Sequence, residues 1–229
     1  MSEAPSPRLV LASRSPQRRR ILELLGVPFA VRVAEVDEHD LGDPTEAALA
    51  NARRKARAVA GQLEHSVRQG ADGHAERAGR RSKGAQSLST DAPSLSELPI
   101  LASDTVVALD GQVLGAPARP AEAARFLRAL SGRRHEVVSA VCLLVPGACE
   151  RTAVSGAQVQ FRALDEATVA WYVASREWQG RAGGYAIQLR GMALVERLEG
   201  DPTAVVGLPV PALLELWPGL LHGEPPPPA

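Results

Sequence analysis

Two groups of acidic residues could support phosphate chemistry. Asp104 interrupts the apolar run PILASDTVVAL (99–109), and Asp37 and Glu38 follow the apolar run FAVRVAEV (29–36). A carboxylate inside an apolar strand needs a partner, because burying an unpaired charge is costly. Asp104 is therefore the strongest candidate for a catalytic residue. Carboxylates near a phosphate bind a divalent cation or orient a water molecule.

The segment LASRSPQRRRILELL (11–25) places basic residues where a helix would not favour them. Ser15 and Pro16 predict an N-cap and a first helical residue, so three arginines (18–20) fall in the first turn or just past it. A helix N-terminus carries partial positive charge and disfavours cations. Two interpretations stay open on this feature alone. Either the arginines extend into water, or backbone N–H groups, serine hydroxyls and a guanidinium bind phosphate.

A further basic run, ARRKARA (52–58), contains Lys55 one turn after Asn51. Its arginines are expected to form a solvated helix face. The sequence contains no Walker phosphate loop and no dinucleotide-binding fingerprint, and its histidines lack metal-ligand spacing. The residues alone therefore indicate a phosphate-binding domain that works with a metal.

Alternating strands and helices must position these candidates. Apolar runs bounded by turn residues predict strands, and capping residues next to periodic apolar residues predict helices. Their alternation, with antiparallel pairs in the second half, predicts an α/β fold with a mixed sheet. The expected strands cover 8–13, 29–36, 99–109, 135–145, 150–164 and 192–200, and the expected helices cover 15–25, 43–61, 120–132, 165–175 and 208–217.

Two segments are expected to lie outside this fold. Residues 62–98 hold no aromatic residue and no isoleucine and are rich in Ser, Gly, Ala, Arg and Gln. Such a segment cannot bury enough surface to offset its ordering entropy, so a disordered insertion is predicted. The Pro-rich tail 222–229 is expected to have no structural role.

Bulk composition excludes several classes of function. The 229 residues include 26 basic and 26 acidic residues, so the zero formal charge predicts no general attraction to nucleic acid or membranes. Aromatic residues, at 3%, are too few to provide base-stacking platforms for RNA. No apolar run approaches transmembrane length, and residues 1–8 lack the apolar core of a signal peptide. Cys142 and Cys149 are not at metal-ligand spacing, so a reduced, cytoplasmic protein is expected.

Eight sequence blocks resemble the Maf (septum formation) family in order and approximate spacing. The resemblance covers the chain apart from residues 1–6, the 62–98 segment and the tail. It implies one catalytic domain over 7–221, with an elongated mixed sheet like that of inosine triphosphatases, flanking helices and a central cleft between two lobes. The blocks are LASRSPQRRRILELLG, EVDE, ARRKARAVA, SDTVV, GQVLGAP, LSGRRHEVVSAV, AGGYAIQLRG and VVGLP.

The resemblance also implies an activity. Maf proteins resemble house-cleaning nucleoside triphosphate pyrophosphatases, which release a nucleoside monophosphate and pyrophosphate with the help of Mg²⁺ or Mn²⁺, often as homodimers. Asp104 would be the proton acceptor, acting on a water that the metal has acidified. By position in the motifs, the phosphate-binding residues would be Ser13, Ser15, Arg18 and Lys55, the metal ligands Glu38 and Asp37, and the base-selecting residues Gln17, Thr105 and Gln188.

Three positions depart from the family pattern. Gln17 stands where the family has an arginine, Ala116 where it has a lysine, and Leu189 where it has a glycine. The loss of two cations would weaken phosphate neutralisation. Arg119, three residues after Ala116, is a candidate to compensate.

The same positions bear on substrate preference. Thr105 and Gln188 resemble the branch that prefers dTTP and UTP, whereas the 7-methyl-GTP branch carries an aromatic residue at position 17. Gln17 fits neither branch, and a pyrimidine preference is predicted from the other two. The alternative is a nucleotide-binding regulator that has lost catalysis. Gln17 and Ala116 favour that alternative, and the retained Asp104 argues against it.

Overall fold

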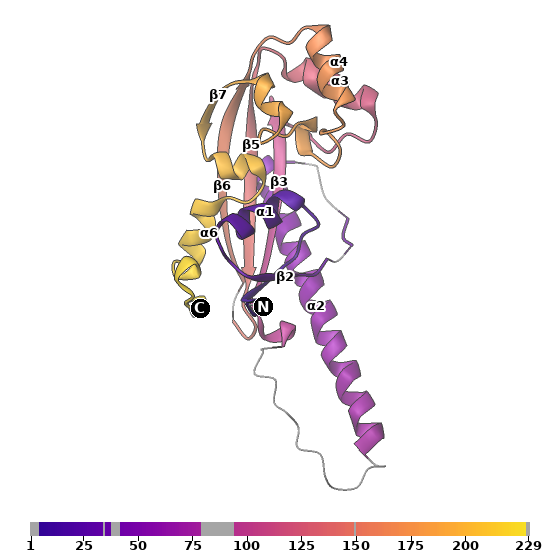
Figure 1. The fold of residues 1–229 in the computed structure, drawn as a ribbon, viewed down its shortest axis with the longest axis vertical. Helices are drawn as coiled ribbons and strands as arrows, with labels where there is room; N and C mark the ends of the chain where they lie inside the picture. The colour runs from indigo at the N-terminus through magenta and orange to yellow at the C-terminus, as the bar shows by residue number, and fades with distance from the viewer. Residues whose placement is uncertain (1–4, 34, 38–41, 79–93, 149, 228–229) are drawn as a thin grey trace.

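The structure is a computed structural model that describes residues 5–33, 35–37, 42–78, 94–148 and 150–227. Over these ranges the chain forms an elongated molecule around one seven-stranded sheet (Figure 1). The strands are β1 (Leu9–Leu11), β2 (Phe29–Val31), β3 (Ile100–Leu109), β4 (Gln112–Leu114), β5 (Arg134–Leu144), β6 (Glu150–Phe161) and β7 (Val195–Gly200). The α-helices are α1 (Pro16–Leu24), α2 (Pro44–Ala78), α3 (Pro120–Leu130), α4 (Glu166–Ala174), α5 (Pro202–Val206) and α6 (Val210–Leu216).

The sheet is mixed. Its strand order is β2-β1-β3-β5-β6-β7, and β4 pairs with the end of β3. The pairs β1–β2 and β1–β3 are parallel, and the remaining pairs are antiparallel. The expected α/β fold with an elongated mixed sheet and flanking helices is therefore confirmed. None of the described helices is long and apolar enough to cross a membrane.

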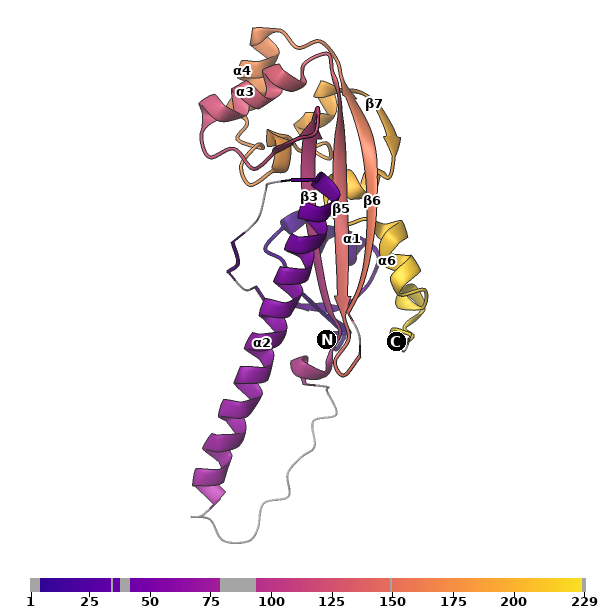
Figure 2. The ribbon, with the colours of Figure 1, turned by 180° about the vertical axis from the view of Figure 1, so that it is seen from behind.

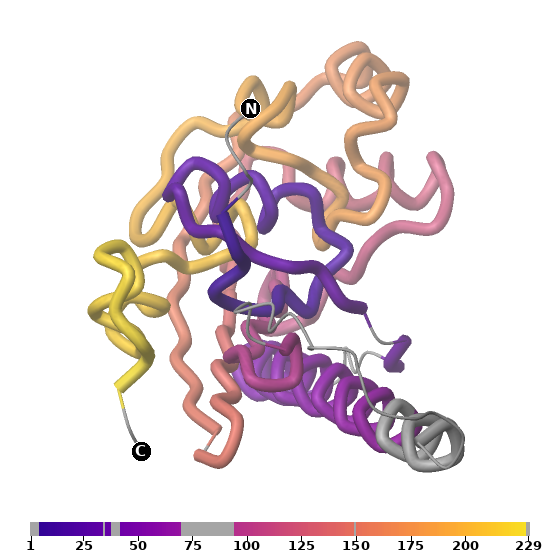
Figure 3. Tube along the Cα trace, turned by 60° about the horizontal axis from the view of Figure 1, so that its bottom comes forward, coloured from indigo at the N-terminus to yellow at the C-terminus, as the bar shows by residue number. Residues whose placement is uncertain are grey.

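Strand β3 separates two cores, because its side chains alternate between the two faces of the sheet. Ile100 and Ala102 pack in the core that α2 covers, whereas Leu101 packs with residues of α1 and α6 on the opposite face. Figures 1 and 2 show α1 and α6 in front of one face and α2 in front of the other, and Figure 3 shows α6 and α2 on opposite sides of the strands. The alternation directs Asp104 toward α2 and Thr105 toward α1.

One edge of β3 is open in its middle. The parallel partner β1 pairs with β3 at Ile100 and Leu101, and β4 pairs with it again from Val107 onward. Between these pairings, β3 pairs with β5 alone among the described strands. A turn at Asp110 and Gly111, both with positive φ, returns the chain into β4, as expected for a tight hairpin. The open stretch contains Asp104 and is where a cleft can form.

A third core lies at the end of the sheet that α3 and α4 cover. Leu127 and Leu130 of α3 and Val169 and Tyr172 of α4 pack there against the ends of β3, β5 and β6. Pro120 opens α3 and Asp165 caps α4 by accepting a hydrogen bond from the backbone N–H of Thr168, as their sequences predict. The long strands thus connect two packed ends and position the cleft between them.

The prediction of a disordered insertion over 62–98 is wrong for a large part of that range. Helix α2 does not end near Gly61 but continues to Ala78, and Leu63 is buried in the core beneath it. Leu98 belongs to the same core, directly after a 3₁₀ turn at Leu95–Glu97. The segment is poor in apolar residues but rich in Ala, Arg, Gln and Glu, which extend a helix readily once its first turns are packed. Residues 79–93 lie outside the described ranges.

Several smaller expectations also need correction. The strand expected over 29–36 is only three residues long, and the strand expected over 192–200 begins at Val195, after a 3₁₀ helix. Helix α5 was not expected. The C-terminal tail has a structural role, because the Glu224 carbonyl accepts hydrogen bonds from Arg8 at 2.8 Å and from the Trp217 indole at 2.9 Å.

Candidate functional site

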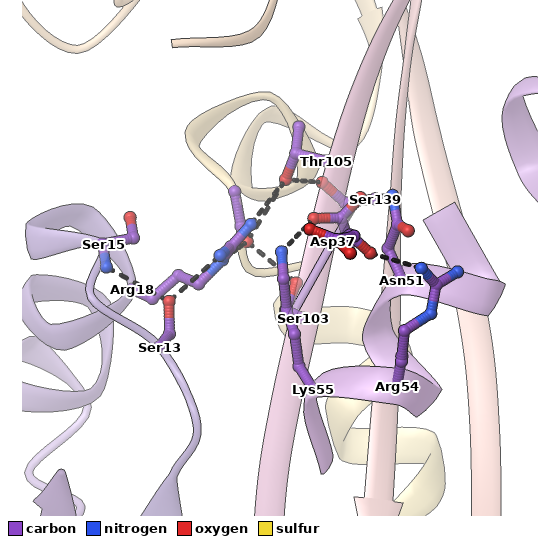
Figure 4. A network of polar contacts seen from close by, with 12 residues as sticks. Ser13, Ser15, Arg18, Asp37, Asn51, Arg54, Lys55, Ser103, Thr105 and Ser139 are labelled. Carbon is purple, nitrogen blue, oxygen red and sulfur yellow. Dashed lines mark hydrogen bonds and ion pairs between the residues drawn. The ribbon is translucent and has the colours of Figure 1, made fainter. Parts of the chain in front are cut away.

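Asp104 is the centre of a buried ion pair between β3 and α2. Its side chain is 7% exposed, and Lys55 Nζ lies 2.5 Å from Oδ1. Asn51 Nδ2 donates to Oδ2 at 3.0 Å. Asn51 and Lys55 share one face of α2 because they are four residues apart (Figure 4). A carboxylate offers about four acceptor positions, so Asp104 can still accept a hydrogen bond from water.

Arg18 is held by acceptors from three segments. Its Nε donates to the carbonyl of Gly207 at 2.8 Å, in the turn after α5. Its Nη1 donates to Ser13 Oγ at 3.0 Å, and its Nη2 donates to Thr105 Oγ1 at 3.2 Å (Figure 4). Gly207 has a φ of 121°, a conformation that side-chain-bearing residues rarely adopt. The guanidinium therefore has a fixed orientation on the α1 side of β3.

A chain of hydroxyl groups continues from Arg18 into the sheet. Ser139 Oγ donates to the carbonyl of Ala204 at 2.7 Å, so its single proton is used there. Thr105 Oγ1 lies 2.7 Å from Ser139 Oγ and 3.5 Å from the carbonyl of Gly207, so these two acceptors compete for its proton. Thr105 can therefore only accept from Arg18. The hydrogen-bond direction fixes Thr105 as a support for the guanidinium.

The N-terminus of α1 is open to an anion. Ser15 is the N-cap, but its side chain does not cap the helix and instead donates to Gln17 Oε1 at 2.9 Å. Ser13 Oγ accepts from the Ser15 backbone N–H at 3.1 Å as well as from Arg18, which leaves its own proton to donate. Uncapped N–H groups, a hydroxyl donor and a guanidinium are the donors that bind phosphate at helix N-termini.

Two adjoining cavities connect these groups. The first, here the β3 cavity, has a volume of about 180 Å³ and is lined by β3, β4 and the loop 180–188. The second, here the α1 cavity, has a volume of about 520 Å³ and is lined by the β1–α1 turn and residues 33, 35, 36 and 179–181. Their boundary is formed by the residues that line both, which are Ser15, Gln17, Arg18, Lys55, Gly180 and Arg181.

The β3 cavity has a polar end and an apolar end. Asp104, Lys55 and Arg18 line the polar end, next to the α1 cavity. Apolar side chains line the remainder, with the amide of Gln188 among them. These apolar residues are Val107, Val113, Leu114, Val137, Ala182, Tyr185 and Ala186. A ligand with one charged end and one flat, weakly polar end fits this division.

The structure brings most of the candidate residues together. Ser13 lines the α1 cavity, and the β3 cavity contains Ser15, Gln17, Arg18, Lys55, Asp104, Thr105 and Gln188. Asp37 is exposed and lines neither cavity, and its backbone carbonyl accepts a hydrogen bond from Arg54 in the polar network of Figure 4. Glu38 lies outside the described residues. Within the described part of the chain, no three His, Cys, Asp or Glu residues form a metal-binding group.

Two of the three positions that depart from the family pattern lie at the cavities. Gln17 is buried at the boundary of the cavities, and Ala116 lines the β3 cavity. Arg119 is exposed at the N-cap of α3 and lines neither cavity. The cleft wall at Ala116 therefore lacks a cation from its own segment.

Three site residues were missed in the sequence. The sequence shows only that Asn51 lies one turn before Lys55. A polar residue on the same helix face as a candidate phosphate-binding lysine is the signal that could have identified it. Ser139 lies in an apolar strand and gave no signal, because its role depends on the pairing of β3 with β5. Arg181 lies in a loop without periodicity, and only the fold shows that it borders both cavities.

A buried histidine supports the apolar end of the cleft. His135 is 2% exposed, its Nε2 lies 2.9 Å from Tyr185 Oη, and its ring stacks edge-on with Phe161 and Tyr185. Desolvation lowers the pKa of His135 to about 4. An interaction with the backbone of Arg133 favours the charged form and offsets this shift only in part. The imidazole is therefore neutral in the folded protein at neutral pH.

This histidine should make the protein sensitive to acid. The imidazole binds a proton near pH 6.5 in the unfolded state but only near pH 4 in the folded state. The contribution of the neutral imidazole to the free energy of unfolding is therefore complete above pH 6.5 and is lost as the pH falls toward 4. Between pH 7 and 5 the loss attributable to His135 is about 2 kcal/mol. Urea unfolding of the wild type and of His135→Gln at both pH values measures the difference. Equal pH dependence in the two proteins would contradict the assignment.

Comparison with known proteins adds to this geometry. The family model for Maf-like protein matches residues 8–218. A dTTP/UTP pyrophosphatase of Deinococcus radiodurans is 40% identical over 220 residues, which are 96% of this chain and 96% of that protein. A dTTP/UTP pyrophosphatase of Thermus thermophilus is 43% identical over 211 residues, 92% of this chain and 93% of the relative.

Solved structures align less closely. The Staphylococcus aureus Ham1 protein is 15% identical with a TM-score of 0.40, covering 67% of this chain and 71% of its own. A nucleoside-triphosphatase / dITP/XTP pyrophosphatase of Mycobacterium abscessus is 20% identical with a TM-score of 0.37, covering 67% and 72%. The family assignment follows from the sequence relatives, which match over nearly the full length of both proteins. By that match, the chain belongs to the Maf-like protein family.

Proposed function

We propose that this protein is a nucleoside triphosphate pyrophosphatase that acts on pyrimidine nucleotides, dTTP and UTP above all. It would hydrolyse the bond between the α and β phosphates and release a nucleoside monophosphate and pyrophosphate. The observation that carries the proposal is the position of the Asp104–Lys55 pair, where a cavity with an apolar end meets one with phosphate-binding donors. The names of the relatives from Deinococcus radiodurans and Thermus thermophilus support the choice of substrate.

The two cavities divide the substrate between them in this proposal. The base and sugar occupy the apolar part of the β3 cavity, where Gln188 can exchange hydrogen bonds with a pyrimidine edge. The phosphates lie at the boundary and in the α1 cavity, against the helix N-terminus and Arg18. The scissile bond is then next to Asp104. Thr105 supports Arg18 at the phosphate end, and its part in base selection stays a prediction from the family resemblance.

Asp104 acts as the proton acceptor in this mechanism. Lys55 and Asn51 hold both carboxylate oxygens, so the side chain is fixed in orientation with acceptor positions left for water. The water oxygen forms a bond to the α-phosphorus while Asp104 takes one proton from the water. The bond from that phosphorus to the bridging oxygen breaks, and the pyrophosphate leaves with its electron pair. Arg18 and Lys55 neutralise charge on the phosphates, as cations do in phosphoryl transfer.

The donors at this site fit a divalent cation. Mg²⁺ needs only one or two protein carboxylates, because substrate phosphates and water complete its coordination. Asp104 is such a carboxylate, and Glu38 and Asp37 remain candidates by family resemblance. A bound cation would supply charge neutralisation and a more acidic water. The homodimer, the cytoplasmic location and the absence of a nucleic-acid partner remain predictions from the sequence.

The second candidate function is nucleotide binding without turnover. Gln17 and Ala116 favour it, since both replace cations of the family pattern. Turnover by the purified full chain separates the two candidates. With Mg²⁺ or Mn²⁺ we expect pyrophosphate release from dTTP and UTP to exceed release from purine nucleotides and 7-methyl-GTP. Nucleotide binding without any pyrophosphate would support the regulator, and faster release from 7-methyl-GTP would overturn the pyrimidine preference.

A further inference from the structure

The basic side chains that line the two cavities differ in whether they already have a partner within the protein. Arg14 pairs with Glu35 at 3.0 Å. Arg18 donates to three protein acceptors, and Lys55 pairs with Asp104. The protein itself thus already supplies partners for these three. A bound triphosphate brings several negative charges to the same place, and positions 17 and 116 offer no cation to meet them.

Arg181 is different, because its side chain has no hydrogen bond or ion pair among the described residues. It is half-buried, its Nε is fully buried without a partner, and it lines both cavities. Desolvation lowers the pKa of Arg181, and the nearby Tyr172 and Glu177, which favour the charged form, do not offset it. A guanidinium in that state gains from any anion that reaches it, and phosphate matches its fork of donors.

The loop that carries Arg181 is fixed next to Ala116. The Gly183 N–H donates to the carbonyl of Gly115 at 3.2 Å. Gly183 has a φ of 68°, and a Cβ there would lie 2.8 Å from Val107, so this close approach requires glycine. Arg181 therefore stands two residues from the contact with the segment that contains Ala116, and both residues line the β3 cavity.

We propose that Arg181 binds the phosphates of the substrate in place of the cation missing at Ala116, at the boundary where the scissile bond lies. The inference rests on the proposed function and adds a phosphate-binding residue to it. It assigns the compensation to Arg181 in the loop before β7 and not to Arg119, which is exposed and lines neither cavity.

The test compares four variants with the wild type. Arg181→Ala should lower kcat/KM for dTTP about 10- to 100-fold, the usual value of a hydrogen-bonded charge contact. Arg181→Lys should recover part of this loss. The matched control, Arg119→Ala, should behave as the wild type. Adding Ala116→Lys to Arg181→Ala should restore activity, because it returns a cation to the same wall of the cleft.

Binding of inorganic pyrophosphate, measured by titration calorimetry, provides a readout that does not need turnover. Arg181→Ala should bind it at least about 10-fold more weakly than the wild type and Arg119→Ala do. Arg181→Gln replaces Arg181→Ala if the alanine variant does not fold. Equal pyrophosphate affinity in all these proteins overturns the inference. If the wild type is active, a failure of Ala116→Lys to restore turnover to Arg181→Ala also overturns it. If the wild type releases pyrophosphate from no nucleotide, the proposed function fails while the binding comparison still decides on Arg181.

Discussion

Asp104→Asn is expected to lower kcat for dTTP by about 10³-fold or more at saturating metal and nucleotide. The amide keeps the size of the carboxylate and can still bond with Lys55 or Asn51, so the site should remain assembled. It cannot accept a proton from water, and it carries no charge to orient a metal-activated water. The loss should therefore appear in kcat, with KM changed little, because Asp104 acts in the transition state.

Steady-state release of pyrophosphate measures this effect, and thermal unfolding shows whether the variant is folded. Asp110→Asn is a matched control, since Asp110 is an exposed acid at the end of the same strand and pairs with Arg133 at the surface. The control should keep wild-type turnover. Near-normal turnover in Asp104→Asn would remove Asp104 from the role of proton acceptor.

Lys55→Met should affect both activity and stability. The side chains of Lys55 and Asp104 are 14% and 7% exposed, so removal of the cation leaves a buried carboxylate with Asn51 as its described partner. Breaking a buried ion pair in this way costs about 3–5 kcal/mol, although the solvent that reaches the cleft reduces this figure. Turnover should fall about 10²- to 10³-fold, because Lys55 holds Asp104 and, in the proposed mechanism, neutralises phosphate charge.

The double variant Lys55→Met/Asp104→Asn separates the two effects. It removes the uncompensated charge, so urea unfolding should show recovered stability relative to Lys55→Met, while activity stays lost. Arg57→Met is the matched control on the same helix, because Arg57 is exposed and its pair with Glu150 is worth at most about 1 kcal/mol. If the double variant were no more stable than Lys55→Met, the ion pair would not be the reason for the loss.

The sequence predicted the central strands well because their apolar runs are long and bounded by turn residues. Asp104 was identified from the cost of a charge within such a run, and its partner Lys55 was selected by the family motif. The spacing of Asn51 and Lys55 placed both on one helix face, but only the packing of α2 on β3 shows that this face meets Asp104. Pairing between distant segments is the step that local patterns do not contain.

The errors have a related cause. Residues 62–78 have too few apolar side chains to predict a packed helix, yet they continue one whose first turns are held by the core. The Pro-rich tail has no local preference for structure, and Arg8 and Trp217 hold it through the carbonyl of Glu224. Arg181 was missed because a loop gains its role from what it lies against, here the Gly115 carbonyl and two cavities.

The position of bond cleavage tests the central claim most directly. Purified protein is incubated with dTTP and Mg²⁺, and the products are followed by phosphorus NMR, with Asp104→Asn as the control for contaminating activity. The arrangement of Asp104 in the β3 cavity, paired with Lys55 at the boundary of the two cavities, predicts thymidine monophosphate and pyrophosphate in equal amounts from the first turnovers. Thymidine diphosphate with inorganic phosphate, or an intact nucleotide that is bound but never cleaved, would contradict it.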